Sequence, residues 1–384
     1  MGSKFKLKRS SMSQELKLLL SIVGMEHAPD LPGHILRTSA SIDWDQFIEL
    51  TRHHRVYPLV YSNVSRLGKE LLPQHVVQVL QQDYTNNTFQ MLRLSAEMQM
   101  IGIQLDKSEI PYLLVKGPLL AERLYGDISL RTCKDLDILV ADQDLERAGA
   151  VLRDAGYFAA DADPATILTE TREHHHSYIH PNKKIQIELH WRLNWKTWSE
   201  PAFDELWARK RTFSFKGVSV HSFGPEDLFL SLTTHGARHG WSRLRWLSDI
   251  DKLMAEELDW KRIVQHLEAY RLQHIGAQAL LLTSRLFGTQ TGDRLPALQP
   301  TRYSYRLAKL AIEYIQGRRT HQYSISLVKG MAKLKYFIHM LQPKAYDMEM
   351  FPLPKGLRFL YVPLRPLLYI RRKLLKRQGL TREM

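Results

Sequence analysis

The chain has 384 residues, of which 44% are hydrophobic, and a formal net charge of +14 at neutral pH. This length exceeds what one small core needs, so we expect two or three structural units of a globular protein. No stretch reaches the ~18 apolar residues of a membrane-spanning helix. The basic first residues lead into no apolar core of a secretory signal peptide. The single cysteine, Cys133, excludes an internal disulfide.

The first part of the chain is predicted to be helical. Apolar residues recur at three- and four-residue intervals in the stretches 14–23, 43–67 and 74–105, as on one face of a helix. A cluster of proline, aspartate and glycine at 29–33 marks a loop after the first helix. We therefore assign residues 1–105 to an N-terminal helical region.

Short apolar runs and turn residues replace the helical pattern between residues 106 and 222. Asp142 is the predicted N-cap of the second helix in this part, and Gly156 its C-terminal stop. The order of elements predicts a mixed α/β core of ~110 residues. In chain order these are a strand at 110–117, a helix at 118–127, a strand at 133–141, a helix at 142–158, and hairpins at 174–193 and 211–223.

The helical pattern returns at Pro225 and continues to residue 340, so we assign 223–342 to a second helical domain. Residues 343–384 form a tail that is rich in proline and basic residues. The predicted fold class is therefore α+β, with a mixed-sheet core that is flanked by helical regions.

The second predicted strand carries two carboxylates close together, in the sequence RTCKDLDILV. Side chains alternate faces along a strand, so Leu136, Ile138 and Val140 share an apolar face, and Asp135 and Asp137 share the other. Two unpaired carboxylates repel each other, whereas a divalent cation removes the conflict. Mg²⁺ binds through one or two carboxylates plus substrate phosphates, so the D-x-D pattern indicates a metal–triphosphate site. Ordinary surface charge at a strand end is the alternative.

A third carboxylate lies on the predicted hairpin strand IQIELHW. Its apolar residues alternate with Gln186, Glu188 and His190, so one face is apolar and the other polar. If this strand pairs beside the D-x-D strand, the three carboxylates can clamp two metal ions ~3.5–4 Å apart, an arrangement that serves in-line nucleotidyl transfer. A strand with one solvated face is the other reading of this alternation.

A lysine and a glycine stand at the turn between the first predicted strand and its helix, in VKGPLLAERLYGD. Gly117 lets a phosphate approach the backbone amides at the helix N-terminus, and Lys116 adds a positive charge. An ordinary strand-to-helix turn has the same features.

Taken together, LLVKGPLLAERLYGDISLRTCKDLDILV and the later IELHW resemble the bacterial uncharacterised nucleotidyltransferase family. That family belongs to the DNA polymerase β-like nucleotidyltransferase superfamily, and the related abortive-infection nucleotidyltransferase toxins carry a similar layout. HRVYPLVYSNV, RLRWLSDIDKL and LPKGLRFLYVPLRPLLYIRR also look like family stretches, so the resemblance covers most of the chain. It implies a polymerase β-like core.

The resemblance also implies roles for individual residues. Asp135 and Asp137 match the metal-binding D-x-D of the superfamily, and Glu188 matches its third carboxylate, where aspartate is common. Gly117 matches the glycine of the phosphate-binding turn, although the superfamily often has Gly-Gly or Gly-Ser where this chain has Lys-Gly. Arg131 matches the family arginine. The implied reaction uses Mg²⁺ or Mn²⁺, moves a nucleoside monophosphate from an NTP to a hydroxyl acceptor, and releases pyrophosphate.

Basic residues elsewhere are candidates for substrate contacts. His190 lies on the Glu188 face and is a candidate to contact substrate or to orient the carboxylate. The segment THGARHGWSRLRWLSDI carries a candidate basic wall facing the nucleotide, made of His235, Arg238, His239, Arg243 and Arg245. We favour Arg238 and Arg243, because a triphosphate needs more positive charge than Lys116 and Arg131 supply. Solvated charges on an amphipathic helix are the alternative.

Two features are predicted to be structural. Of the consecutive His174, His175 and His176, only the first and third can share a face of a strand, and no further ligand is evident. We therefore predict a polar strand and not a metal site. Cys133 is predicted to pack, because no acylating context surrounds it.

The predicted partners are an NTP and an unknown hydroxyl acceptor, such as a biosynthetic small molecule, a peptide, a sugar or an RNA 3′ end, in the reducing cytoplasm. The positive net charge leaves a second reading open, an RNA-binding module or a toxin that modifies tRNA. The tail RPLLYIRRKLLKRQGL predicts a basic amphipathic helix from Pro366. We expect it to pack on the protein, with contact to a membrane surface or to RNA as alternatives.

Overall fold

The computed structural model describes residues 12–28, 30–160, 174–194, 198–317 and 322–327, and beyond these 348, 351–354, 357, 360–365, 367–368 and 371. The predicted hairpins and both carboxylate-bearing strands fall within these residues. Pro366 and everything from residue 372 onward lie outside the described residues, so the amphipathic tail helix stays a prediction.

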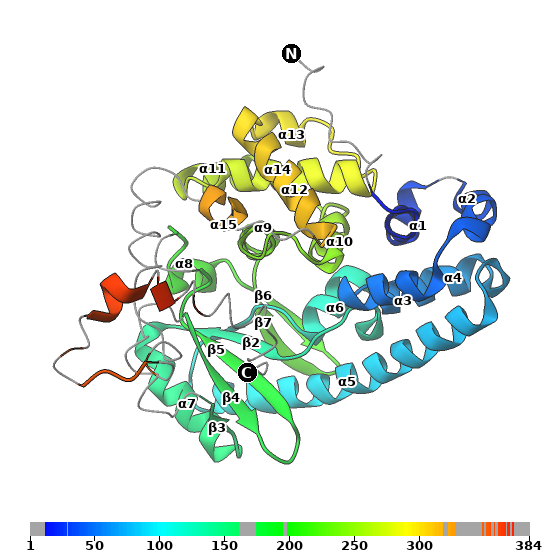
Figure 1. Cartoon of the computed structure of the whole chain (residues 1–384). Coiled ribbons are helices and arrows are strands. Elements are labelled where there is room, and N and C mark those ends of the chain that lie inside the picture. Colours follow the sequence, from blue (N-terminus) through cyan, green and yellow to red (C-terminus); the bar gives the residue numbers. More distant parts are fainter. Residues whose placement is uncertain are drawn as a thin grey trace.

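The sheet is mixed, which confirms the predicted α+β fold class (Figure 1). Within the described residues its strands are β1 (Tyr112–Leu114), β2 (Leu136–Val140), β3 (Phe158–Ala159), β4 (His175–His180), β5 (Ile185–His190), β6 (Arg211–Phe215) and β7 (Val218–Ser222). Their spatial order is β3-β4-β5-β2-β1-β7-β6. β2 pairs with β5, and β1 with β7, in parallel, and the other neighbours are antiparallel.

The strand sequences explain these positions. β1 and β2 are apolar runs that are buried along their whole length, as expected for strands covered on both faces. In β5, Ile185, Ile187 and Leu189 are buried while Gln186 and Glu188 are partly exposed, so the predicted alternation is confirmed. Both predicted hairpins are confirmed as well, β4 with β5 and β6 with β7.

The N-terminal part is helical, as predicted, and its last helix runs along the sheet (Figure 1). The helices are α1 (Gln14–Val23), α2 (Leu31–Thr38), α3 (Trp44–His53), α4 (Tyr57–Leu67) and α5 (Gln74–Lys107), with 3₁₀ turns η1 (Met25–His27), η2 (Ser39–Ser41) and η3 (Lys69–Leu71). Met98 and Ile101 of α5 share a hydrophobic cluster with Ile138 and Val140 of β2. The apolar face predicted for the D-x-D strand therefore packs toward α5.

The opposite face of the sheet looks toward the C-terminal helices (Figure 1). These and the helices between the strands are α6 (Pro118–Tyr125), η4 (Ile128–Leu130), η5 (Asp142–Asp144), α7 (Leu145–Asp154), α8 (Phe203–Ala208), α9 (Pro225–Arg238), α10 (Leu244–Leu253), α11 (Trp260–Ala269), α12 (Gln273–Leu286), α13 (Arg294–Ala297), α14 (Arg302–Ile315) and α15 (Gln322–Leu327). Leu139 of β2 belongs to a second hydrophobic cluster, with Phe229 of α9 and Leu247 of α10. Asp137, two residues before Leu139, is on this same face.

The predicted stop of α7 is confirmed and its predicted start is wrong. Gly156 follows the helix with φ of 88°, a conformation that favours glycine. Asp142 begins the 3₁₀ turn η5 and is no N-cap, since α7 begins only at Leu145. The backbone forms a 3₁₀ turn before the α-helix starts. The Asp144 carboxylate accepts a hydrogen bond from Arg147 Nη1 at 2.7 Å and caps no backbone amide.

Helices from both ends of the chain share the second cluster, which contains side chains of α1, α3 and α4 together with α9, α10 and α12. The division into the ranges 1–105, 106–222, 223–342 and 343–384 stays a prediction. In the part of the chain that the structure describes, every helix is too short or too polar to cross a membrane.

Candidate active site

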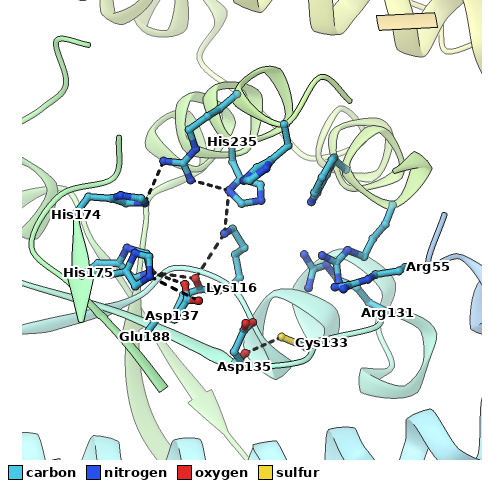
Figure 2. Close-up of a pocket in the computed structure, with 15 residues that line it drawn as sticks. Arg55, Lys116, Arg131, Cys133, Asp135, Asp137, His174, His175, Glu188 and His235 are labelled. Carbon is cyan, nitrogen blue, oxygen red and sulfur yellow. Dashed lines mark hydrogen bonds and ion pairs between the residues drawn. The ribbon is translucent and has the colours of Figure 1, made fainter. Parts of the chain in front are cut away.

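A pocket of about 290 Å³ opens where β2, β4 and β5 meet α9 and α10 (Figure 2). Its wall combines carboxylates, imidazoles and basic side chains. It includes every residue predicted from the sequence to belong to the site except Gly117 and Arg243. The lining residues are Arg55, Lys116, Arg131, Cys133, Asp135, Asp137, His174, His175, Glu188, His190, His235, Arg238, His239, Arg245 and Trp246.

Sheet pairing brings the three predicted carboxylates together. Asp137 of β2 stands directly opposite Glu188 in the parallel register of β2 and β5. Asp135 comes just before β2 and projects into the same pocket (Figure 2). Asp137 is 5% exposed, so water screens the interactions of its charge with neighbouring charges only weakly.

The pKa values of the two aspartates are pushed apart. Burial, reinforced by the charges of Asp137 and Glu188, raises the pKa of Asp135 to about 6. Burial also acts to raise the pKa of Asp137, but the Lys116 ammonium, 3.7 Å from Oδ1, and the hydrogen-bonded His190 outweigh it and hold that pKa well below its usual range. The charges of Asp137 and Glu188 therefore make ionisation of Asp135 less favourable than it is in water, and a further cation would relieve this repulsion.

The donor atoms fit a divalent cation. One oxygen each of Asp137 and Glu188 and one ring nitrogen of His190 lie within 4.8 Å of one another. Asp135 lines the same pocket but does not belong to this group of close donors. Carboxylate oxygens are ligands that Mg²⁺ and Mn²⁺ accept, and a bound cation would relieve the repulsion that raises the pKa of Asp135.

A neutral histidine positions the lysine above Asp137. His235 Nδ1 lies 3.1 Å from Lys116 Nζ and 3.3 Å from Arg238 Nη2 (Figure 2). Lysine and arginine only donate hydrogen bonds, so Nδ1 is the acceptor and the ring is neutral. Burial, with Lys116 close by, lowers the pKa of His235 well below its ordinary value, which agrees with this assignment. His235 thus fixes two cations over the carboxylates, a role that the sequence did not predict.

Gly117 forms the predicted strand-to-helix turn. Its φ of 97° lies in the left-handed region, which favours glycine, and it is the N-cap of α6. A Cβ at this position would lie 3.4 Å from Leu136 Cδ2, in ordinary contact, so the backbone conformation is the main reason for glycine here. Contact of this turn with phosphate stays a prediction.

Two of the three consecutive histidines enter the pocket, which corrects the prediction that only the first and third can share a side. His174 and His175 both line it, and their ring centroids are 4.8 Å apart. The alternation rule fails because β4 begins only at His175, so His174 is not part of the strand. His176 packs instead against Trp191, with ring centroids 4.8 Å apart.

Only one of the two arginines predicted to face the nucleotide belongs to the pocket wall. Arg238 lines the pocket, where its Nη1 lies 3.1 Å from His174 Nε2. Arg243 does not line it, because as the N-cap of α10 it has an extended backbone and its Nη1 donates to the carbonyl of His53. Arg245, two residues further in the first turn of α10, enters the pocket instead.

Two basic residues of the wall lack a carboxylate partner. Among the described residues, Arg55 and Arg245 form no direct ion pair, although Arg245 is buried and its Nη1 donates to Thr132 Oγ1 at 3.0 Å. Arg245 Nε has no hydrogen-bond partner among the residues that the structure describes. Burial lowers the pKa of Arg245 to about 10, and the group still carries its charge at neutral pH. A buried positive charge that forms no direct ion pair is costly, so this end of the pocket suits an anion.

Cys133 is buried beside Asp135 and its Sγ donates a hydrogen bond to the backbone oxygen of Asp135 at 2.9 Å. Burial raises the pKa of this thiol, so it stays protonated at neutral pH. A protonated thiol that is held by the backbone agrees with a packing role.

Arg131 lines the pocket, but its guanidinium is occupied. Nε and Nη2 donate to the two carboxylate oxygens of Asp249, at 2.8 and 2.9 Å, and both residues are buried. This bidentate pair joins the turn before β2 to α10, and its predicted contact with phosphate stays a prediction.

We expect Arg131→Ala to lower the free energy of unfolding by about 3–5 kcal/mol, because it leaves the buried Asp249 carboxylate without its partner. Urea unfolding measures this loss. The control is Arg153→Ala, which removes an exposed pair with Glu146 and is expected to leave stability nearly unchanged. If Arg131→Ala instead unfolds at the same urea concentration as the wild type and binds nucleotide more weakly, the role of the guanidinium is to bind phosphate.

Residues 40–288 match the protein family described as "Uncharacterised nucleotidyltransferase", a range that contains every residue lining the pocket. Among solved structures the chain is similar to an antigenic nucleotidyltransferase-like protein from Paracoccidioides brasiliensis, with 14% identity, a TM-score of 0.33, and coverage of 54% of this chain and 93% of that chain. None of the curated proteins compared with the chain matches it.

Proposed function

The chain belongs to the uncharacterised nucleotidyltransferase family, and from this premise we propose that it moves a nucleoside monophosphate from an NTP to a hydroxyl acceptor with the help of divalent cations. The observation that carries the proposal is the pairing of Asp137 with Glu188 on adjacent parallel strands, with Asp135 beside them. We further propose that the core belongs to the DNA polymerase β-like superfamily, in which D-x-D and a third carboxylate hold the cations.

The two ends of the pocket have different chemistry, which supports separate places for nucleotide and acceptor. Arg245 is among the charges that act on Asp135, whereas Arg238 interacts with Asp137 and Glu188. We assign the triphosphate to the end with Arg55 and Arg245, which form no direct ion pair within the described part of the chain. The acceptor hydroxyl then lies at the Glu188 end.

In this proposal Asp135 and Asp137 hold cations against the phosphates, and Glu188 serves the acceptor end. When bound there, divalent cations neutralise phosphate charge and lower the pKa of the acceptor hydroxyl. Lys116, held by His235, adds fixed positive charge beside the reacting phosphate. The acceptor hydroxyl gives up its proton to solvent and its oxygen forms a bond to the α-phosphorus, while the bond from that phosphorus to the oxygen bridging to the β-phosphate breaks and pyrophosphate leaves toward the arginines.

The class of acceptor is the open part of the proposal. A biosynthetic small molecule or peptide is our first candidate. The net charge of +14 favours a second one, an RNA such as tRNA, since phosphate-rich partners bind basic proteins.

The experiment that tests the proposal incubates the protein with each of the four NTPs, labelled at the α-phosphate, with Mg²⁺ or Mn²⁺ and a cell extract. We expect label to enter a product and pyrophosphate to appear in equal amount. Digestion of the extract with ribonuclease beforehand separates the two acceptor classes, and mass spectrometry identifies the product. Hydrolysis alone, or no transfer from any NTP, would count against a nucleotidyltransferase.

A further inference from the structure

Two imidazoles enter the carboxylate end of the pocket. His175 of β4 and His190 of β5 stand opposite each other in the antiparallel register of the hairpin. His190 Nε2 lies 3.1 Å from Asp137 Oδ1 and 3.4 Å from Glu188 Oε2, and His175 Nε2 lies 3.8 Å from Glu188 Oε1. The donor atoms of Asp137, Glu188 and His190 thus lie within 4.8 Å of one another, and His175 adjoins this group through the other oxygen of Glu188.

These separations are close to those between neighbouring ligands of one metal ion. With metal–ligand distances of about 2.0–2.2 Å, two ligands of the same ion lie about 3.0–3.5 Å apart. Both contacts of His190 fall within that range. The contact of His175 exceeds it by a few tenths of an ångström, which a small rotation of its partly exposed ring can close.

The nitrogen donors bear on which ion is bound. Mg²⁺ prefers an all-oxygen octahedral shell and keeps several waters, whereas imidazole suits transition ions. In a pure Mg²⁺ site the two imidazoles could serve only as hydrogen-bond partners of the carboxylates or of the substrate, whereas a transition ion can take them as ligands. The third imidazole, His174, accepts a hydrogen bond from Arg238 at its Nε2, so we leave it out of the ligand set.

We propose that this end of the pocket binds a divalent first-row transition ion in preference to Mg²⁺, through the side chains of Asp137, Glu188, His175 and His190. This inference rests on one premise of the proposed function, namely that a divalent cation binds at these carboxylates. It replaces the expected Mg²⁺ at the acceptor end by an ion that accepts both oxygen and nitrogen ligands.

Pulsed electron paramagnetic resonance of bound Mn²⁺ tests the proposal directly, because a coordinated imidazole gives a ¹⁴N modulation that oxygen ligands cannot give. We expect this modulation in the wild-type protein, a weaker one in His175→Gln, and none in the double variant His175→Gln, His190→Gln. His176→Gln is the matched control, because its ring packs on Trp191 outside the pocket and its spectrum should equal that of the wild type.

Competition provides the second readout. Mg²⁺ should displace Mn²⁺ or Co²⁺ from the wild-type protein only at an excess of about tenfold or more, and this preference should disappear in His175→Gln. Circular dichroism first checks that each variant folds. Should the buried His190 variants not fold, the partly exposed His175 decides the question alone.

The outcomes separate this inference from the proposed function. No Mn²⁺ binding, bound Mn²⁺ without ¹⁴N modulation, or equal affinity for Mg²⁺ would overturn the inference even if nucleotide transfer is observed with Mg²⁺. Conversely, nitrogen-ligated Mn²⁺ in a protein that transfers no nucleotide would leave the inference standing and remove the proposed function.

Discussion

With Asp135 and Asp137 both replaced by asparagine, we expect metal-dependent NTP binding to fall by at least ~10²-fold, below detection in a calorimetric titration. Asparagine keeps the size of each side chain and removes two of the three carboxylate charges of the pocket. Neither amide can replace a carboxylate that faces a divalent cation, so the ion no longer bridges protein and phosphates. ATP and GTP should both be affected, because the change concerns the phosphates and not the base.

The two single variants should differ in stability. Burial and two like charges raise the pKa of Asp135, so its ionised form destabilises the metal-free folded protein at neutral pH, and Asp135→Asn should keep or raise the melting temperature. Asp137 pairs with Lys116 and His190, so Asp137→Asn should lower it. If the substitutions instead disrupt the fold in general, both single variants should have a lower melting temperature than the wild-type protein.

The control for the double variant is Asp142→Asn, which changes an exposed carboxylate shortly after the other end of β2. It should bind nucleotide and metal as the wild type does. Equal affinity of the wild-type protein and the double variant for ATP and GTP, in the presence of the same metal, would remove the D-x-D pair from the site.

Local periodicity was enough to predict the strands that carry this pair. The alternation of Leu136 and Ile138 with the two aspartates gives the face of β2 without knowledge of its neighbours. The same rule puts Glu188 and His190 on one face of β5, and both now line the pocket. The parallel pairing of β2 with β5 could only be supposed, since the strands are far apart in the sequence.

Contacts between distant segments explain what the sequence did not predict. Arg55 reaches the pocket from the connection between α3 and α4, and although it lies in the family-like stretch HRVYPLVYSNV, nothing in that stretch marks it as a ligand contact. Arg245 replaces Arg243 because the exact start of α10 sets which arginine turns inward, and helix ends are the least predictable boundaries. Arg131 binds Asp249, which lies 118 residues further along the chain, so its partner required the fold.

Glu188→Gln should retain NTP binding and lose transfer, with turnover lowered by ~10²-fold or more. Asp135 and Asp137 remain to hold the nucleotide with its cation, whereas glutamine lacks the charge needed at the acceptor end. The variant should separate nucleotide binding from transfer, because Glu188 is on β5, opposite Asp137, and not in the segment that carries the D-x-D pair.

Nucleotide affinity from calorimetry and product formation from labelled NTP measure these two steps on the same preparation. Glu146→Gln is the control, because it changes an exposed carboxylate whose ion pair within the described residues is with Arg153, and it should leave both values unchanged. If His175 and His190 share an ion with Glu188, the transfer lost in Glu188→Gln should recover partly at higher Mn²⁺ and not at higher Mg²⁺, since the two imidazoles still favour the transition ion. Unchanged turnover in Glu188→Gln would place the acceptor elsewhere and leave Asp135 and Asp137 as the only carboxylates of the reaction.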